Sequence, residues 1–268
     1  IAMLKGTGVN VRKVRRLEML YESCIESSES FADAEAKIVA GLTDMKKKGI
    51  YGLKSVIAYR TGMNIQPTKR WAAMDDFARL KRDQAASKTG KIRIAYKNIE
   101  DYLTCVAFAM AGEQNVPVQF HSGIGDTDED MYLANPLQLR TVLEDPAFAR
   151  TTFVPLHVFP HVQDTAYLAH VYGNVYFDLS YAIPLTHGAA AGLIEDALTI
   201  APYSKLLYGT DAPGLPDLWY TGGIVWRRAL SRVLTGWVQE GALTQKLADD
   251  VAERVLYKNA AGLYDIKV

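Results

Sequence analysis

Short apolar runs alternate with helix-length segments through most of the chain from residue 50 onward. A continuous apolar run bounded by turn residues is typical of a parallel strand that is buried on both faces. The segments between these runs show helical spacing of apolar residues or open at a proline. The alternation therefore predicts a parallel sheet with right-handed helical crossovers. The expected strands are 53–59, 117–121, 153–157, 175–179 and 206–210.

The first 49 residues show a different pattern. Helical spacing predicts helices over 11–26 and 31–48, and it predicts no strand beyond a short piece near Val9. Basic residues in the first of these helices are expected to form one solvated face, namely Arg12, Lys13, Arg15 and Arg16. Further helices are expected over 67–86, 99–114, 136–143, 163–172, 188–200, 223–239 and 243–257.

Three of the apolar runs end on side chains that can bind a metal. These side chains are His121, His157 and Asp211. In an α/β barrel the functional residues lie at the C-terminal ends of the strands, so these three are expected to converge. A carboxylate such as Asp211 after an uncharged strand also needs a metal or a cation to offset its desolvation. Two imidazoles and a carboxylate suit a divalent metal that activates water.

Chain size and apolar content bound the fold. A chain of 268 residues with 49% apolar residues fits one large α/β domain. We therefore expect a single domain over 1–268, with a helical part at 1–49 and βα units over 50–268. A closed barrel needs eight strands, and only five are clear. The pattern leaves open an open sheet or a barrel that lacks its first strands.

Charge and cysteine usage exclude several classes of function. The formal net charge is zero, so no field attracts nucleic acid or an anionic membrane. The sequence has no apolar stretch of ~20 residues and no signal-peptide pattern. A chain that begins at Ile1 leaves a missing leader open. Cys24 and Cys105 lack metal-type spacing, which favours two reduced thiols in a cytoplasmic protein.

Several strings in a fixed order carry a family resemblance. They read GLKSVIAYRTG, FHSGIGD, NPLQLR, AYLAHVYGNVYFDLS, YGTDA and ERVLYKNAAGLYDI. Over residues 50–265 the chain resembles the amidohydrolase-2 branch of the amidohydrolase superfamily. Within that branch it is most similar to the module that occurs alone or fused to glutamine-synthetase-like proteins. The resemblance implies an α/β fold of the (β/α)8 TIM-barrel type, incomplete or distorted at the N-terminus.

The resemblance also implies roles for the strand-end residues. His121 and His157 match the family's fifth-strand and sixth-strand histidines, and Asp211 matches the eighth-strand aspartate. The family's first strand carries a His-x-His pair that holds the metal, whereas the first histidine here is His121. A chain without the first strand and a member that no longer binds metal are both compatible with this departure.

Further candidate residues follow from the resemblance, in the case of Lys54, and from positions at strand ends and in the loop after His121 for the others. Lys54 matches a strand-four lysine that is carboxylated and bridges two metals in some members, although a lysine there can also extend to solvent. Arg60, with Tyr59 at the same strand end, is expected to grip a substrate carboxylate in a bidentate manner. Asp126 in the polar loop after His121 and Ser180 after the strand 175–179 are expected to line the substrate pocket.

The function implied by this resemblance is metal-dependent hydrolysis of a C–N bond in a small amide, including γ-glutamyl-type amides. Zinc, as one or two ions held by His121, His157, Asp211 and Lys54, is expected to lower the pKa of a bound water toward ~7. Asp211 is expected to take the proton of that water, and His157 to polarise the carbonyl or pass the proton on. Decarboxylation by a member of the same branch and a non-catalytic binding or scaffold module are the alternatives. The expected partner is a small-molecule substrate, and homo-oligomerisation is left open.

Overall fold

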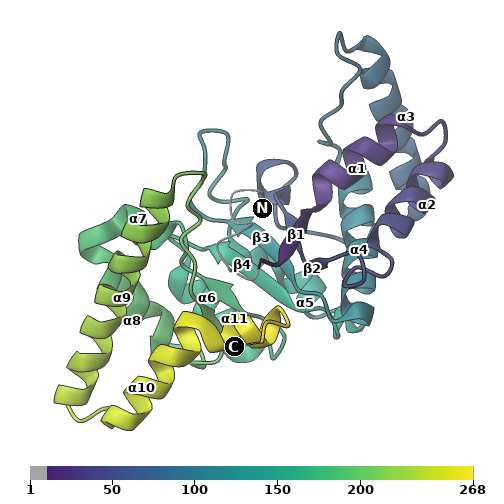
Figure 1. The fold of residues 1–268 in the computed structure, drawn as a ribbon. Helices are drawn as coiled ribbons and strands as arrows, with labels where there is room; N and C mark the ends of the chain where they lie inside the picture. Colours follow the sequence, from purple (N-terminus) through teal and green to yellow (C-terminus); the bar gives the residue numbers. More distant parts are fainter. Residues whose placement is uncertain (1–10, 268) are drawn as a thin grey trace. The chain divides into compact units, whose positions relative to one another are not determined.

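The computed structural model describes residues 11–267 (Figure 1). Contacts group the chain into two compact units. Unit 1 comprises the residues up to 120 together with 132–134 and 138–152, and unit 2 comprises 121–131, 135–137 and the residues from 153 onward. The single domain expected over 1–268 stays a prediction. The short strand considered near Val9 lies outside the described residues.

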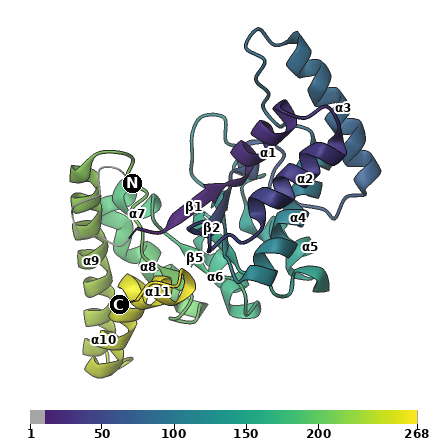
Figure 2. The same cartoon turned by 45° about the vertical axis from the view of Figure 1, so that its right-hand side comes forward.

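Unit 1 contains parallel strands and the helices that cover them. β1 pairs with β2, and β2 pairs with β3, in parallel. The strands are β1 (Lys13–Arg16), β2 (Ile50–Ser55) and β3 (Val118–Ser122), whose residues 118–120 belong to this unit. The helices are α1 (Leu17–Glu26), α2 (Phe31–Leu42), α3 (Arg70–Ala86), α4 (Lys97–Gln114) and α5 (Arg140–Leu143). α1 packs against α2, and α3 packs against α4 (Figure 2).

The helix predicted over 11–26 is wrong in its first part, because residues 13–16 form the strand β1. The basic side chains of this segment, expected to form one solvated helical face, instead contact other residues of unit 1. The guanidinium of Arg12 lies 4.3 Å from the centroid of the Tyr51 ring. Arg15 donates to the carbonyl of Gly41 at 3.1 Å. Parallel pairing with β2 overrides the weak helical pattern of this charged segment, as tertiary context commonly does.

Strand and helix ends in unit 1 follow local signals. The Ser30 hydroxyl accepts a hydrogen bond from the backbone N–H of Asp33 at 3.2 Å and begins α2. Asn115 adopts a left-handed conformation, with φ of 51°, at the end of α4. The strand predicted over 53–59 is shifted, because β2 ends at Ser55 and residues 57–59 form a 3₁₀ turn.

Unit 2 contains short parallel strands and a larger set of helices. Phe153 bridges Val175 in parallel, and β5 pairs with β6 in parallel. The strands are β4 (Phe153–His157), β5 (Phe177–Asp178) and β6 (Leu206–Leu207). The helices are α6 (Val162–Val171), α7 (Ala182–Thr186), α8 (Ala190–Ile200), α9 (Pro216–Gln239), α10 (Gln245–Glu253) and α11 (Asn259–Leu263). α8 packs against both α6 and α9 (Figure 1).

α9 begins at Pro216 rather than at the predicted residue 223. Gly222 and Gly223 lie inside this helix, where close packing explains the two glycines. A Cβ on Gly222 would lie 2.9 Å from Cγ2 of Thr210, and one on Gly223 would lie 3.1 Å from the Tyr208 hydroxyl. Glycine therefore lets this helix approach the segment that follows β6.

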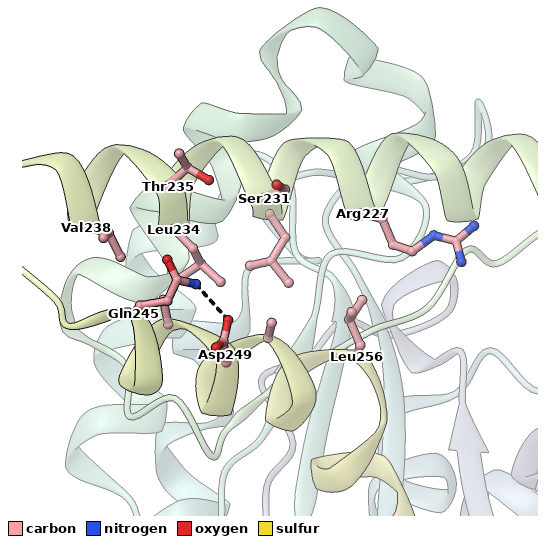
Figure 3. A pocket seen from close by; sticks show the side chains of 11 residues that line it. Arg227, Ser231, Leu234, Thr235, Val238, Gln245, Asp249 and Leu256 are labelled. Atoms are coloured by element: carbon pink, nitrogen blue, oxygen red, sulfur yellow. Dashed lines mark hydrogen bonds between the residues drawn. The ribbon is translucent and has the colours of Figure 1, made fainter.

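A groove of about 260 Å³ lies between α9 and α10 (Figure 3). Leu230, Leu234 and Val238 of α9 are among the apolar residues that line it. On the α10 side, Gln245 donates its amide to the carboxylate of Asp249 at 2.8 Å. None of the site residues expected from the sequence lines this groove.

Two properties expected from the sequence can be compared with the described residues. Every helix within residues 11–267 is too short or too polar to span a bilayer. Cys24 and Cys105 are free thiols. Burial raises the pKa of Cys105 to about 12, so this thiol stays protonated near neutral pH.

Candidate functional site

His121, His157 and Asp211 all belong to unit 2, at or just beyond the ends of strands. The His121 and His157 rings have centroids 4.9 Å apart and an interplanar angle of 55°. Nε2 of His157 lies 3.8 Å from Oδ2 of Asp211. The His157 side chain is 2% exposed, whereas that of Asp211 is 56% exposed. The structure therefore brings a buried imidazole beside a carboxylate that solvent or a substrate can reach.

A chain of hydrogen bonds orients the other side of the His157 ring. Nδ1 of His157 lies 2.8 Å from the Ser180 hydroxyl. That hydroxyl donates to Oδ1 of Asp178 at 2.8 Å, and Oδ1 also accepts the backbone N–H of His157 at 2.8 Å. Ser180 was expected to bind substrate, but it is 3% exposed and contacts His157. Its substrate-binding role stays a prediction, while its contact with His157 is a feature that the sequence did not reveal.

Backbone strain accompanies this arrangement. His157, Val158 and Asp211 have φ values of 69°, 48° and 49°. Positive φ is unusual for residues other than glycine, and above all for a β-branched residue such as Val158. Such strain persists only where the surroundings enforce it, and it concentrates at functional sites. The backbone at the end of β4 and after β6 therefore shows the strain that is typical of a functional site.

Glu129 is a residue of this site that the sequence did not single out. It lies in the polar loop after β3, and its Oε2 is 3.3 Å from Nε2 of His121. Its side chain is only 2% exposed. Neither carboxylate oxygen accepts a hydrogen bond from any described residue. The acidic run in the loop was the only signal for it, and nothing in that run distinguishes Glu129 from its neighbours.

Lys54, Tyr59 and Arg60 belong to unit 1. Arg60 is held there by Glu22, whose Oε1 lies 2.9 Å from its Nη1, and by the carbonyl of Ile94 at 3.1 Å. The Arg60 side chain is 8% exposed. Lys54 is half-buried in β2, paired in register with Gln119 of β3. Metal bridging by Lys54 and substrate binding by Tyr59 and Arg60 stay predictions.

The remaining candidates lie around the rim. Asp126 is exposed in the loop after His121, and its backbone carbonyl accepts the N–H of Glu129 at 3.0 Å. Substrate binding by Asp126 stays a prediction. Tyr181, which follows Ser180, places its ring 5.9 Å from the His157 ring. Trp219 donates its indole N–H to the carbonyl of Ala212 at 2.7 Å, and this bond ties α9 to the segment that carries Asp211.

The chain is similar to proteins of one family. A model of the amidohydrolase family matches residues 68–266. Protein fluG of Emericella nidulans is 32% identical over 225 residues, which are 81% of this chain and 26% of fluG. The chain thus spans about a quarter of that relative.

Solved structures show the same likeness. A protein from Lactobacillus casei described as a metal-dependent hydrolase superposes with a TM-score of 0.89 at 28% identity, over 98% of this chain and 68% of that one. A uronate isomerase from Thermotoga maritima superposes with a TM-score of 0.68 at 17% identity, over 92% of this chain and 57% of that one. These structures confirm the predicted α/β class of the TIM-barrel type. The family match and the fluG relationship together show that the chain belongs to the amidohydrolase family.

Proposed function

We propose that the protein hydrolyses a C–N, amide-type bond of a small molecule at the site formed by His157 and Asp211. The observation that carries the proposal is the placement of the buried His157 Nε2 at 3.8 Å from the half-exposed Asp211 carboxylate. A carboxylate and an imidazole within reach of one substrate position form a usual acid–base pair. The family relationship supports hydrolytic chemistry of this kind.

A divalent metal is implied by the family, and its ligands can be compared with the residues present. No three His, Cys, Asp or Glu side chains among residues 11–267 are grouped so as to hold a metal ion. His121 with Glu129, and His157 with Asp211, supply two pairs. Zinc sites in enzymes have at least three protein ligands, so the described residues do not fit a complete zinc site. Zinc dependence stays a prediction, and the proton steps below do not depend on it.

The proposed reaction moves one proton through two side chains. As a water oxygen attacks the amide carbonyl carbon, Oδ2 of Asp211 accepts a proton from that water. Nε2 of His157 then receives this proton and delivers it to the leaving nitrogen as the C–N bond breaks. The products are a carboxylic acid and an amine. Once Nε2 of the buried His157 holds the proton, exclusion of bulk water favours its transfer to the leaving group.

Amide hydrolysis by the purified protein tests the proposal. A panel of small amides, γ-glutamyl amides included, is incubated with the protein with and without added Zn²⁺ or Mn²⁺, and released amine or ammonia is quantified. Turnover is expected for at least one amide. Asp211→Asn keeps the shape of the side chain but removes the proton acceptor, so kcat should fall by about 10²–10⁴-fold.

Asp217→Asn is the matched control, because Asp217 is an exposed aspartate in the first turn of α9. Its kcat should equal that of the wild type. Release of carbon dioxide from aromatic carboxylates without amide turnover would show a decarboxylase instead. Absence of both reactions would contradict the proposed hydrolase and favour the alternative of a binding or scaffold module.

A further inference from the structure

We propose that Asp178 and Ser180 form a positioning pair that fixes neutral His157 as the Nδ1–H tautomer. In this state the lone pair of Nε2 faces Asp211. The pair does not touch the reacting atoms and acts through His157. Its consequence for catalysis rests on the proposed function, whereas the tautomer itself does not.

The direction of each hydrogen bond follows from the proton inventory. Oδ1 of Asp178 accepts from the backbone N–H of His157 at 2.8 Å, from the backbone N–H of Ser180 at 3.0 Å and from the Ser180 hydroxyl at 2.8 Å. A serine hydroxyl has one proton, and here that proton points to Asp178. The hydroxyl oxygen can therefore only accept from His157, whose Nδ1 lies 2.8 Å away.

The opposite arrangement is unfavourable. If the Ser180 hydroxyl donated to Nδ1 of His157, its oxygen would face the Asp178 carboxylate at 2.8 Å with no proton between them. Asp178 is 8% exposed and Ser180 is 3% exposed, so solvent does not screen such a contact between two acceptors. Loss of one hydrogen-bond donor to a buried carboxylate also costs free energy. The Nδ1–H tautomer satisfies all three groups at once.

Tight packing keeps the pair in place. A Cβ on Gly209 would lie 2.9 Å from Cβ of Ser180 and 3.4 Å from Oδ2 of Asp178. Gly209 precedes Asp211 by two residues, so the backbone that carries Asp211 rests directly on the positioning pair. Partners of this kind set the tautomer and the ring orientation of a functional histidine.

Nitrogen NMR of the five histidines tests the tautomer without any substrate. The His157 signals are assigned by their loss in His157→Gln, at a pH where the ring is neutral. In the wild type, Nδ1 is expected to show the shift of a protonated ring nitrogen and Nε2 that of an unprotonated one. Ser180→Ala should give a mixture of both tautomers. A wild-type ring protonated mainly at Nε2 would overturn the proposal.

Thr165→Val is the matched control, because Thr165 is a fully buried hydroxyl in unit 2 that bonds to the carbonyl of His161. Thr165→Val should lower the free energy of unfolding, measured in urea, about as much as Ser180→Ala does. It should leave the His157 signals unchanged. On an amide that the wild type hydrolyses, Ser180→Ala should lower kcat by about 10–100-fold with little change in KM. Thr165→Val should not lower kcat.

The two readouts separate this proposal from the proposed function. An unchanged kcat in Ser180→Ala, beside a disturbed tautomer, would overturn the positioning role. An inactive wild type with the Nδ1–H tautomer would reject the hydrolase and the positioning role in catalysis, and it would retain the assignment of the tautomer. A Ser180→Ala protein that loses its fold leaves the wild-type NMR result as the deciding measurement.

Discussion

At the scale of single residues, Gly123 determines how closely two site segments approach each other. Its φ is 67°, and a Cβ at this position would lie 2.2 Å from the carbonyl oxygen of Phe159. That oxygen accepts the backbone N–H of Ile124 at 2.7 Å. The glycine therefore permits both a left-handed turn after His121 and close contact with the segment after His157.

Substitution of this glycine should be costly. Gly123→Ala is expected to lower the free energy of unfolding by at least ~2 kcal/mol, because the new Cβ must displace backbone and because alanine resists positive φ. Gly173→Ala is the control, since no atom lies within 4 Å of its would-be Cβ and its φ is not positive. Its effect should be within ~0.5 kcal/mol. Equal midpoints in urea unfolding for the two variants would contradict the packing described for Gly123.

At the scale of elements, a strand could be predicted from the sequence where its own apolar side chains stabilise it. It could not be predicted where residues far along the chain do so. The apolar runs 117–121 and 153–157 were recognised because burial on both faces leaves a continuous hydrophobic signal. β1 gave no such signal, because its segment is basic. Arg12 just before the strand contacts the Tyr51 ring, and Arg15 within it donates to the carbonyl of Gly41, and both partners lie far along the chain. The same holds for Glu129, whose burial beside His121 depends on the path of a loop. The placement of His121 and His157 at strand ends was predictable from the sequence, and the loop-borne partner Glu129 was not.

α4 also carries an ionisable carboxyl group on its core-facing side, where burial disfavours the charged form. Glu100 is fully buried, and only one of its carboxyl oxygens is bonded, by the Thr61 hydroxyl at 2.9 Å. Burial raises the pKa of Glu100 well above the usual value, and the nearby Glu18 adds to the effect. Burial likewise raises the pKa of Glu18. The folded protein therefore holds these protons more tightly than the unfolded chain does.

This arrangement predicts the sign of a pH effect. Stability should fall as the pH rises from the unfolded value, near 4.5, through the raised folded pKa of Glu100, because ionisation then opposes folding. Glu100→Gln should flatten this fall and should add about 1–3 kcal/mol at pH 8, which urea unfolding at several pH values can measure.

Glu113→Gln provides the control, since Glu113 is an exposed glutamate on the same helix. It should leave the pH profile unchanged. Stability that instead rises between pH 5 and 8 in the wild type, and equally in Glu100→Gln, would refute the assignment of the effect to this carboxyl group.

At the scale of the whole molecule, the chain passes between the two units several times. The chain leaves unit 1 after Phe120, in the middle of β3, and returns to it more than once before Thr152. His121 and Glu129 consequently belong to unit 2 although most of the sequence around them belongs to unit 1. The strand-end rule predicted that His121 and His157 would meet, but no feature of the sequence predicted this division.

The division of β3 has a consequence for fragment complementation. A break after Thr152 separates two polypeptides, of which the first carries His121 and Glu129 and the second carries His157 and Asp211. Because the His121 ring contacts the His157 ring of the other polypeptide, neither fragment alone should show this ring pairing. Co-expressed fragments should recover it only on reassociation, so the histidine NMR signals would report assembly of the two pieces. Native-like His157 signals from the 153–268 fragment alone would show that His121 does not shape its surroundings.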